Sequence, residues 1–202
     1  MKKLLMLATT ASLTLFAIST ASAATTVTGV VDLTGTVPAQ CSVVNGGTPP
    51  SGDFGATISV NVAGSIADPA TGHLLTGLQG GTDALAGQAV FQINCTGGNN
   101  TATLKATPLA LNPAVGVTPS GYASSVSYTG EVDFATTGSP VSITRTSDST
   151  TSPASTGFRL ANPGNNVAIK AHDFTTGANV ATDILMAGSY LGEITVIITP
   201  GA

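Results

Sequence analysis

Residues 91–107 read FQINCTGGNNTATLKAT, and this stretch indicates the fold class of the chain. Its first part alternates apolar and polar residues, and the apolar positions are Phe91, Ile93 and Cys95. Its last part repeats the alternation with Ala102, Leu104 and Ala106. Residues 97–100 between them, Gly-Gly-Asn-Asn, are turn formers. Because successive side chains of a strand point to opposite faces, the stretch predicts two half-buried strands separated by a turn.

The same two-residue period recurs along the rest of the chain. Short alternating runs rich in β-branched residues lie at 27–36, 58–62, 141–143 and 194–198. Clusters of Gly, Pro and Asn at 46–50 and 162–166 punctuate them. No segment has a convincing helical period, and residues 80–88 are expected to hold one helical turn at most. These features predict an all-β fold, an antiparallel sandwich, in which the Ser/Thr-rich residues 147–156 form an exposed loop.

The N-terminal residues have the pattern of a cleavable secretory signal peptide. Lys2 and Lys3 precede an apolar run from Leu4 to Ile18, and Ala21-Ser22-Ala23 supplies the small residues that a signal peptidase accepts. The apolar run is shorter than the roughly 20 residues of a membrane-spanning helix. We therefore expect residues 1–23 to be removed on export and the mature chain to begin at Ala24.

The composition of the mature chain excludes some classes of partner. Without Lys2 and Lys3 it carries four basic and ten acidic residues, a formal net charge of −6. A nucleic-acid partner is not expected, because binding phosphate requires a basic surface. Only 8% of the whole chain is charged while 42% is hydrophobic, so the surface must consist largely of Thr, Ser, Asn and Gly. Such a surface suits an extracellular protein that packs against copies of itself.

Cys41 and Cys95 are the two cysteines of the chain. In an oxidising compartment an even number of cysteines predicts a disulfide, and two cysteines allow one intrachain pairing. A metal or redox pair is the alternative, but no CxxC or Cys/His cluster supports it. We expect a structural Cys41–Cys95 bond, no metal and no cofactor.

The residues that carry acid–base chemistry are few and scattered. His73 and His172 lie in polar stretches, and His172-Asp173 is the nearest approach to an acid–base pair. Adjacent residues of a regular strand point to opposite faces, so this spacing is not expected to orient the imidazole. Glu131 and Asp133 are expected to share a solvated strand face. No nucleophile elbow, zinc-binding HExxH or phosphate-binding loop occurs, and an enzymatic role is not expected.

Three features, the alternating segment 25–41 before Cys41, the phrase around Cys95 and the C-terminal segment 187–199, together resemble the pilins of the chaperone-usher class, including type 1-like fimbrial subunits and spore coat protein U-like domains. The alternating segment 25–41 ends at the first cysteine, as in such pilins. The second cysteine stands in the phrase Phe91-Gln92-Ile93-Asn94-Cys95-Thr96-Gly97. Residues 187–199 resemble the small-residue turn, Tyr and final strand of these families, although the chain lacks the aromatic residue that many of them carry next to the C-terminus.

The resemblance implies an immunoglobulin-like sandwich that lacks its last strand. In such pilins a periplasmic chaperone covers the open groove, and the N-terminal extension of the next subunit then replaces it at an outer-membrane usher. Here residues 24–37 would be the N-terminal extension and residues 38–202 the pilin-like domain. The pocket-filling residues would be Val27, Val31 and Leu33, with Gly29 where the groove is tight. The C-terminal strand lining the groove would contribute Tyr190, Ile194, Val196 and Ile198.

The function implied by the resemblance is that of a structural subunit of a surface fimbria, exported through the periplasm and serving adhesion or biofilm formation. Its partners would be copies of itself or related pilins, the chaperone and the usher. Two alternatives remain open: a secreted monomeric adhesin or glycan-binding module, and a spore-coat or matrix-type structural protein. From alternation alone, residues 24–37 are equally compatible with an ordinary first strand or a flexible tail.

Overall fold

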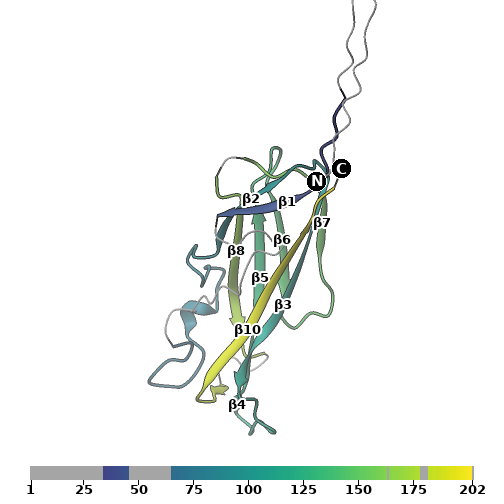
Figure 1. Ribbon diagram of the computed structural model, residues 1–202. Helices are drawn as coiled ribbons and strands as arrows, with labels where there is room; N and C mark the ends of the chain where they lie inside the picture. Colours follow the sequence, from purple (N-terminus) through teal and green to yellow (C-terminus); the bar gives the residue numbers. More distant parts are fainter. Residues whose placement is uncertain (1–33, 46–64, 163, 178–181, 202) are drawn as a thin grey trace, which may run out of the picture. The chain divides into compact units, whose positions relative to one another are not determined.

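The computed structural model describes residues 34–45, 65–162, 164–177 and 182–201. Within these ranges helical structure is limited to one 3-10 turn, η1 (Thr76–Leu78), and the remaining elements are strands (Figure 1). The strands are β1 (Cys41–Asn45), β2 (Val90–Cys95), β3 (Asn100–Asn112), β4 (Tyr122–Ala123), β5 (Ser125–Phe134), β6 (Val141–Thr146), β7 (Ala154–Phe158), β8 (Val167–Thr175), β9 (Ile184–Leu185) and β10 (Ser189–Thr199). The predicted all-β class is confirmed.

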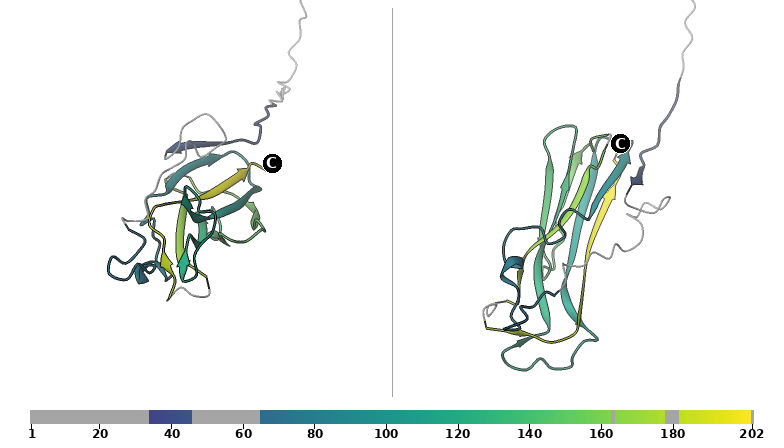
Figure 2. Two further views of the ribbon diagram at one scale, coloured as in Figure 1. Left: turned by 90° about the horizontal axis from the view of Figure 1, so that it is seen from below. Right: turned by 90° about the vertical axis from the view of Figure 1, so that its left-hand side faces the viewer.

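Eight of these strands form one antiparallel sheet that folds over on itself. Its order is β1-β2-β8-β5-β3-β10, with β6 paired to β5 and β7 paired to β3. β5 pairs along most of its length with β8 and β6 but meets β3 through only two residue pairs, Leu109↔Val126 and Ala110↔Ser125. One layer therefore contains β1, β2, β8, β5 and β6, and the other contains β7, β3 and β10. Figure 2 shows these strands gathered around a common interior.

The hydrophobic core lies between the two layers. β5 alternates along its length, with buried side chains at Val126, Tyr128, Val132 and Phe134. Phe134 packs against Phe158 of β7, with ring centroids 5.0 Å apart, so aromatic contact joins the layers.

Gly130 occupies a position on the buried face of β5 but has no side chain to place there. A Cβ at this position would lie 3.4 Å from the Ala106 Cβ and 3.5 Å from the Ile194 Cδ1. Both distances are ordinary van der Waals contacts, so β3 and β10 pack directly over this point of β5 and leave room for little more than a Cβ.

Four predicted strands are confirmed at the predicted positions. Phe91 and Ile93 are buried in β2, Ala102, Leu104 and Ala106 in β3, and Ile143 in β6, while residues 194–198 lie in β10. Residues 96–99 connect β2 to β3, so the predicted turn is present at 97–99 while Asn100 opens β3. The alternating run at 58–62 and residues 27–33 of the run at 27–36 lie outside the described residues. Residues 34–36 are described and form no strand. Residues 80–88 form turns rather than helix.

The prediction of an exposed loop at residues 147–156 is wrong at both of its ends. Ser147 is buried, and its Oγ accepts a hydrogen bond of 2.9 Å from the Tyr128 backbone N–H. Ala154 opens β7, which pairs with the start of β3. Short hydroxyl side chains bond readily to nearby backbone groups, and this allows Ser147 to be buried.

Among the described residues, no helix has the length and apolar character needed to cross a membrane.

Candidate strand-acceptor edge

β10 is the last strand of the chain and follows β3 over nearly its whole length. The register pairs Ile194 with Ala106, Val196 with Leu104 and Ile198 with Ala102, so these side chains share the inner face of the sheet. Tyr190, Ile194 and Ile198 are half-buried and pack against the core, and Val196 is buried. The four residues predicted for a C-terminal strand therefore do lie in one; their role as a groove lining stays a prediction.

The outer edge of β10 has no strand partner in the part of the chain that the structure describes. β10 pairs with β3 on one side, and the order of the sheet ends there. At the other end of the order, β1 pairs only with β2 among the described strands. An edge strand presents a row of backbone N–H and C=O groups that can pair with another chain.

The side chains that face the core are less completely buried in β10 than in β3. Ala102 and Leu104 are both 0% exposed, whereas Ile198, opposite Ala102, is half-buried. Exposed apolar side chains of β10 also include Leu191 and Ile197. An added strand would therefore gain main-chain hydrogen bonds and apolar contacts at the same edge.

Two tyrosines hold β10 in place from inside the sandwich. The Tyr128 hydroxyl of β5 donates a hydrogen bond of 3.0 Å to the Glu193 carbonyl, next to the irregularity between Leu191 and Glu193. The Tyr190 hydroxyl donates to the carbonyls of Ala123 and Met186. Burial raises the pKa of both phenols, most strongly that of Tyr128, so both remain donors at neutral pH. These hydrogen bonds, together with the pairing to β3, hold β10 in place although no strand pairs with its outer edge among the described residues.

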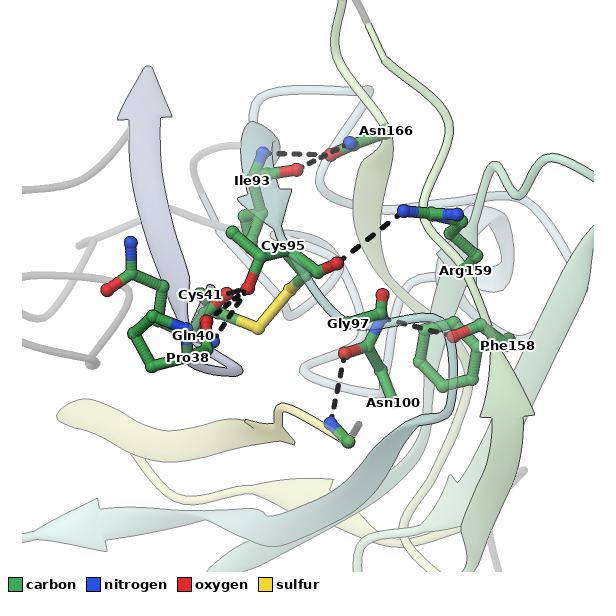
Figure 3. The surroundings of a disulfide bond; sticks show 12 residues. Pro38, Gln40, Cys41, Ile93, Cys95, Gly97, Asn100, Phe158, Arg159 and Asn166 are labelled. Carbon is green, nitrogen blue, oxygen red and sulfur yellow. Dashed lines mark hydrogen bonds between the residues drawn. A yellow bond between two sulfur atoms is a disulfide. The ribbon is translucent and has the colours of Figure 1, made fainter. Parts of the chain in front are cut away.

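The Cys41–Cys95 disulfide joins β1 to β2 at one end of the sandwich (Figure 3). The two cysteines stand directly opposite each other in the ladder, with Cα atoms 4.1 Å apart. The predicted bond is confirmed. We call this end, comprising Cys41, Cys95 and the 96–100 turn, the disulfide pole.

Side-chain amides organise the backbone around the disulfide pole. Asn166 is buried and bridges the backbone of Ile93, accepting from its N–H at 2.9 Å and donating to its carbonyl at 2.7 Å. Asn100 is buried as well and donates to the carbonyls of Gly97 and Phe158 (Figure 3). These bonds supply the partners that buried polar groups require.

Both the start of β1 and the end of β10 are fastened at the disulfide pole. The Thr96 hydroxyl donates to the Pro38 carbonyl at 2.9 Å and accepts from the Gln40 N–H at 3.0 Å. The Gly201 N–H approaches the Asn100 side-chain oxygen at 3.4 Å. Val37, next before Pro38, is 79% exposed. The chain thus leaves the domain toward its N-terminus beside the point where β10 ends.

The predicted donor residues Val27, Gly29, Val31 and Leu33 lie outside the described residues.

The structure brings together one polar cluster that the sequence analysis did not expect. His172 Nδ1 lies 2.6 Å from Asp173 Oδ2, and His172 Nε2 lies 3.0 Å from Glu131 Oε2. The expectation that adjacent His172 and Asp173 side chains point apart is wrong. The β5–β8 register shifts between Ser127 and Thr129, and Asp173 has φ of +52°, so the strand is not regular there.

Glu131 and Asp133 do share one face of β5, as predicted, and both pair with Lys170 of β8. The face is less solvated than expected, because the Glu131 side chain is only 20% exposed. Burial alone would raise the pKa of the Asp133 carboxyl, but hydrogen bonds from Lys170 and Ser142 hold it below its ordinary value. The ion pair with Asp133 raises the pKa of the Lys170 ammonium. The cluster ties β5 to β8, and among the described residues no group of His, Cys, Asp and Glu side chains has an arrangement suited to a metal ion.

Comparisons with protein-family models, with curated proteins and with solved structures found no match to this chain.

Proposed function

We propose that the mature chain is a structural subunit of a bacterial surface fimbria and that its domain is completed by a strand from a neighbouring subunit. The observation that carries the proposal is the half-covered edge of β10, which combines an unpartnered backbone edge among the described strands with apolar side chains facing the core. The donor is the N-terminal extension, residues 24–37. Adhesion or biofilm formation is the role that such a fibre serves.

The connectivity supports a donor from another subunit rather than from the same chain. The N-terminal extension joins the domain at Pro38 of the disulfide pole, and β10 also ends at this pole. If the extension folded back along the β10 strand of its own domain, both would run toward the disulfide pole and pair in parallel. Parallel pairing is slightly less stable per residue than antiparallel pairing. The extension of a second copy is free to enter antiparallel.

The partners that the resemblance implies would act on the same edge. Before assembly the open β10 edge is an aggregation hazard, because it can template pairing with any extended chain. A periplasmic chaperone covers it in transit, and an outer-membrane usher exchanges chaperone for subunit. Residues 1–23 supply the export signal. No cofactor or metal is needed for strand addition.

Substitutions on the two parities of the N-terminal extension test the proposal. Leu33→Asp and Val31→Asp bury an unpaired charge in the groove and are expected to abolish filaments. Gly29→Leu overpacks the groove at a cost of about 1–3 kcal/mol and lowers filament yield. Thr28→Asp is the matched control, since its side chain is on the opposite parity and reaches solvent. Filaments are counted by electron microscopy of producing cells, and the periplasmic subunit level is measured in parallel.

The outcomes separate the alternatives. Loss of filaments at odd positions with a normal subunit level supports a donor strand. Normal assembly of both Gly29→Leu and Leu33→Asp would show that residues 24–37 are not the donor. Equal losses at both parities with depleted subunit indicate an ordinary intramolecular strand. Unchanged filaments in cells that lack the chain, together with lost ligand binding, indicate a monomeric adhesin.

A further inference from the structure

The two residues that follow β10 lie against the backbone of the disulfide pole. The β3–β10 ladder ends with the pair Thr101↔Thr199. Pro200 has no N–H with which to continue it, and Gly201 lies against the turn that connects β2 to β3. The Gly201 N–H approaches the Asn100 side-chain oxygen at 3.4 Å, which is long for a hydrogen bond. The contact therefore depends more on shape than on hydrogen bonding.

Two glycines make this close approach possible. A Cβ on Gly97 would overlap the Gly201 carbonyl oxygen and lie 2.8 Å from its carbonyl carbon. A Cβ on Gly201 would overlap the Asn99 carbonyl oxygen and lie 2.6 Å from its carbonyl carbon. Neither glycine has a positive φ, so the space available, and not the backbone conformation, requires glycine here. Because the obstructing atoms belong to the backbone, either Cβ would force the two segments apart.

The turn on which Gly201 rests is fixed in place by other contacts. Asn100 is buried and donates to the carbonyls of Gly97 and Phe158, each at 3.1 Å (Figure 3). Cys95, two residues before Gly97, is bonded to Cys41. β10 is paired on one side only among the described strands. The end of β10, and not the turn, is therefore the part that separates when the contact is lost.

Gly98 shows how local the requirement for glycine is. It stands between Gly97 and Asn99 in the same turn, and it has no positive φ either. A Cβ added to Gly98 would meet no atom within 4 Å. An alanine at position 98 thus adds the same methyl group to the same turn without touching Gly201, and it supplies a matched control.

We propose that Pro200 and Gly201 form a latch that holds the end of the β10 edge at the disulfide pole, and that a partner strand pairs with the latched edge only. The role of the latch in assembly rests on the proposed function. An antiparallel partner begins beside the end of β10, so its first hydrogen bonds require Ile198 and Thr199 to be in place. When the latch opens, the apparent affinity for a partner strand falls with the fraction of subunits that remain latched.

Hydrogen exchange of the purified mature subunit tests whether the latch exists. Gly97→Ala and Gly201→Ala are each expected to accelerate amide exchange in residues 194–199 about tenfold. Exchange in β5 should stay as it is in the unaltered chain, and Gly98→Ala should change neither strand. Unchanged exchange at the end of β10 in both latch variants would overturn the latch. Equal acceleration in β5, or the same effect from Gly98→Ala, would overturn it as well.

Filament yield tests what the latch does in assembly. Gly97→Ala and Gly201→Ala are expected to lower the yield about tenfold at a normal periplasmic level of subunit, and Gly98→Ala is expected to assemble normally. A normal or higher yield from both latch variants would overturn the statement that a partner strand requires the latched edge, while leaving strand addition intact. If the unaltered chain forms no filament, the proposed function fails and with it this role, while hydrogen exchange still decides whether residues 200–201 hold the edge.

Discussion

β3 and β10 are each other's partners, yet one is a central strand and the other an edge. β3 has β10 along one side and, on the other, β7 at its start and β5 near its end. β10 has only β3 among the described strands. Ala102 and Leu104 of β3 are completely buried, whereas Ile194 and Ile198 of β10 are only partly covered. Both strands alternate apolar and polar residues in the same way, so the alternation does not explain the difference. The burial of a side chain depends here on how many neighbouring strands its own strand has.

The largest expected difference between β3 and β10 comes from placing the same charge in each strand. Leu104→Asp places a carboxylate where no solvent reaches it, and we expect no folded subunit in the periplasm. Ile198→Asp puts the same group at the half-covered edge, where it can reach water, so the subunit should fold and filaments should be lost. Subunit level and filament yield are measured for both. Equal subunit levels for the two variants would contradict the comparison.

Removing the disulfide weakens the pole at which β1 begins and β10 ends. Cys41→Ser with Cys95→Ser is expected to lower the free energy of unfolding by about 2–5 kcal/mol, because the bond restricts the unfolded chain. Urea unfolding of the purified subunit, carried out on the unreduced unaltered protein and on the double variant, measures the loss. A thiol titration of denatured, unreduced mature protein should find no free thiol. A change below experimental error in the urea midpoint would show that the bond contributes nothing to stability.

Tyr128→Phe removes the hydroxyl through which β5 donates a hydrogen bond to the edge strand β10. The Glu193 carbonyl then loses its donor, and we expect a loss of about 0.5–1.5 kcal/mol. Hydrogen exchange should accelerate in β10 more than in β3, since only the edge strand is released. The matched control is Tyr122→Phe at an exposed position. Equal acceleration in both strands would mean that the hydroxyl supports the whole fold rather than the edge.

The smallest expected effect concerns acid pH and the β5–β8 cluster. The pKa of Asp133 is lowered in the folded state, so its contribution to stability is complete above the unfolded value of about 3.9. The contribution is lost as pH falls through the lower folded value. Because the pair with Lys170 is partly exposed, it is worth about 1 kcal/mol at most.

Urea unfolding between neutral and acid pH measures this contribution. Asp133→Asn should make the stability of the subunit less dependent on pH in the acid range. An unchanged pH dependence would show that the Lys170 pair does not stabilise the fold.

Several elements could be predicted from residues alone. Alternation correctly predicted that Phe91 and Ile93 of β2 and Ala102, Leu104 and Ala106 of β3 are buried. A two-residue period in a short run bounded by turns indicates a strand with one buried face. The disulfide was predicted from the expected export of the chain and from its even number of cysteines. The alternating runs of β5 and β8 were not identified, although Glu131 and Asp133 were expected on one strand face. β5 alternates as clearly as β3, but its Gly130 and its charged residues weaken the apolar signal.

The sequence by itself determined the strand class, the pairing of Cys41 with Cys95 and the inner parity of β10, since these depend on local periodicity and on a pairing with one solution. Only the tertiary structure decided which strands are edges, because sheet order is made by contacts between residues distant in the chain. It also decided that His172 lies between Glu131 and Asp173, where a shift in register and a positive φ override regular strand geometry. The half-covered face of β10 arises in the same way: the same alternating residues are buried or open according to the neighbours that the fold supplies.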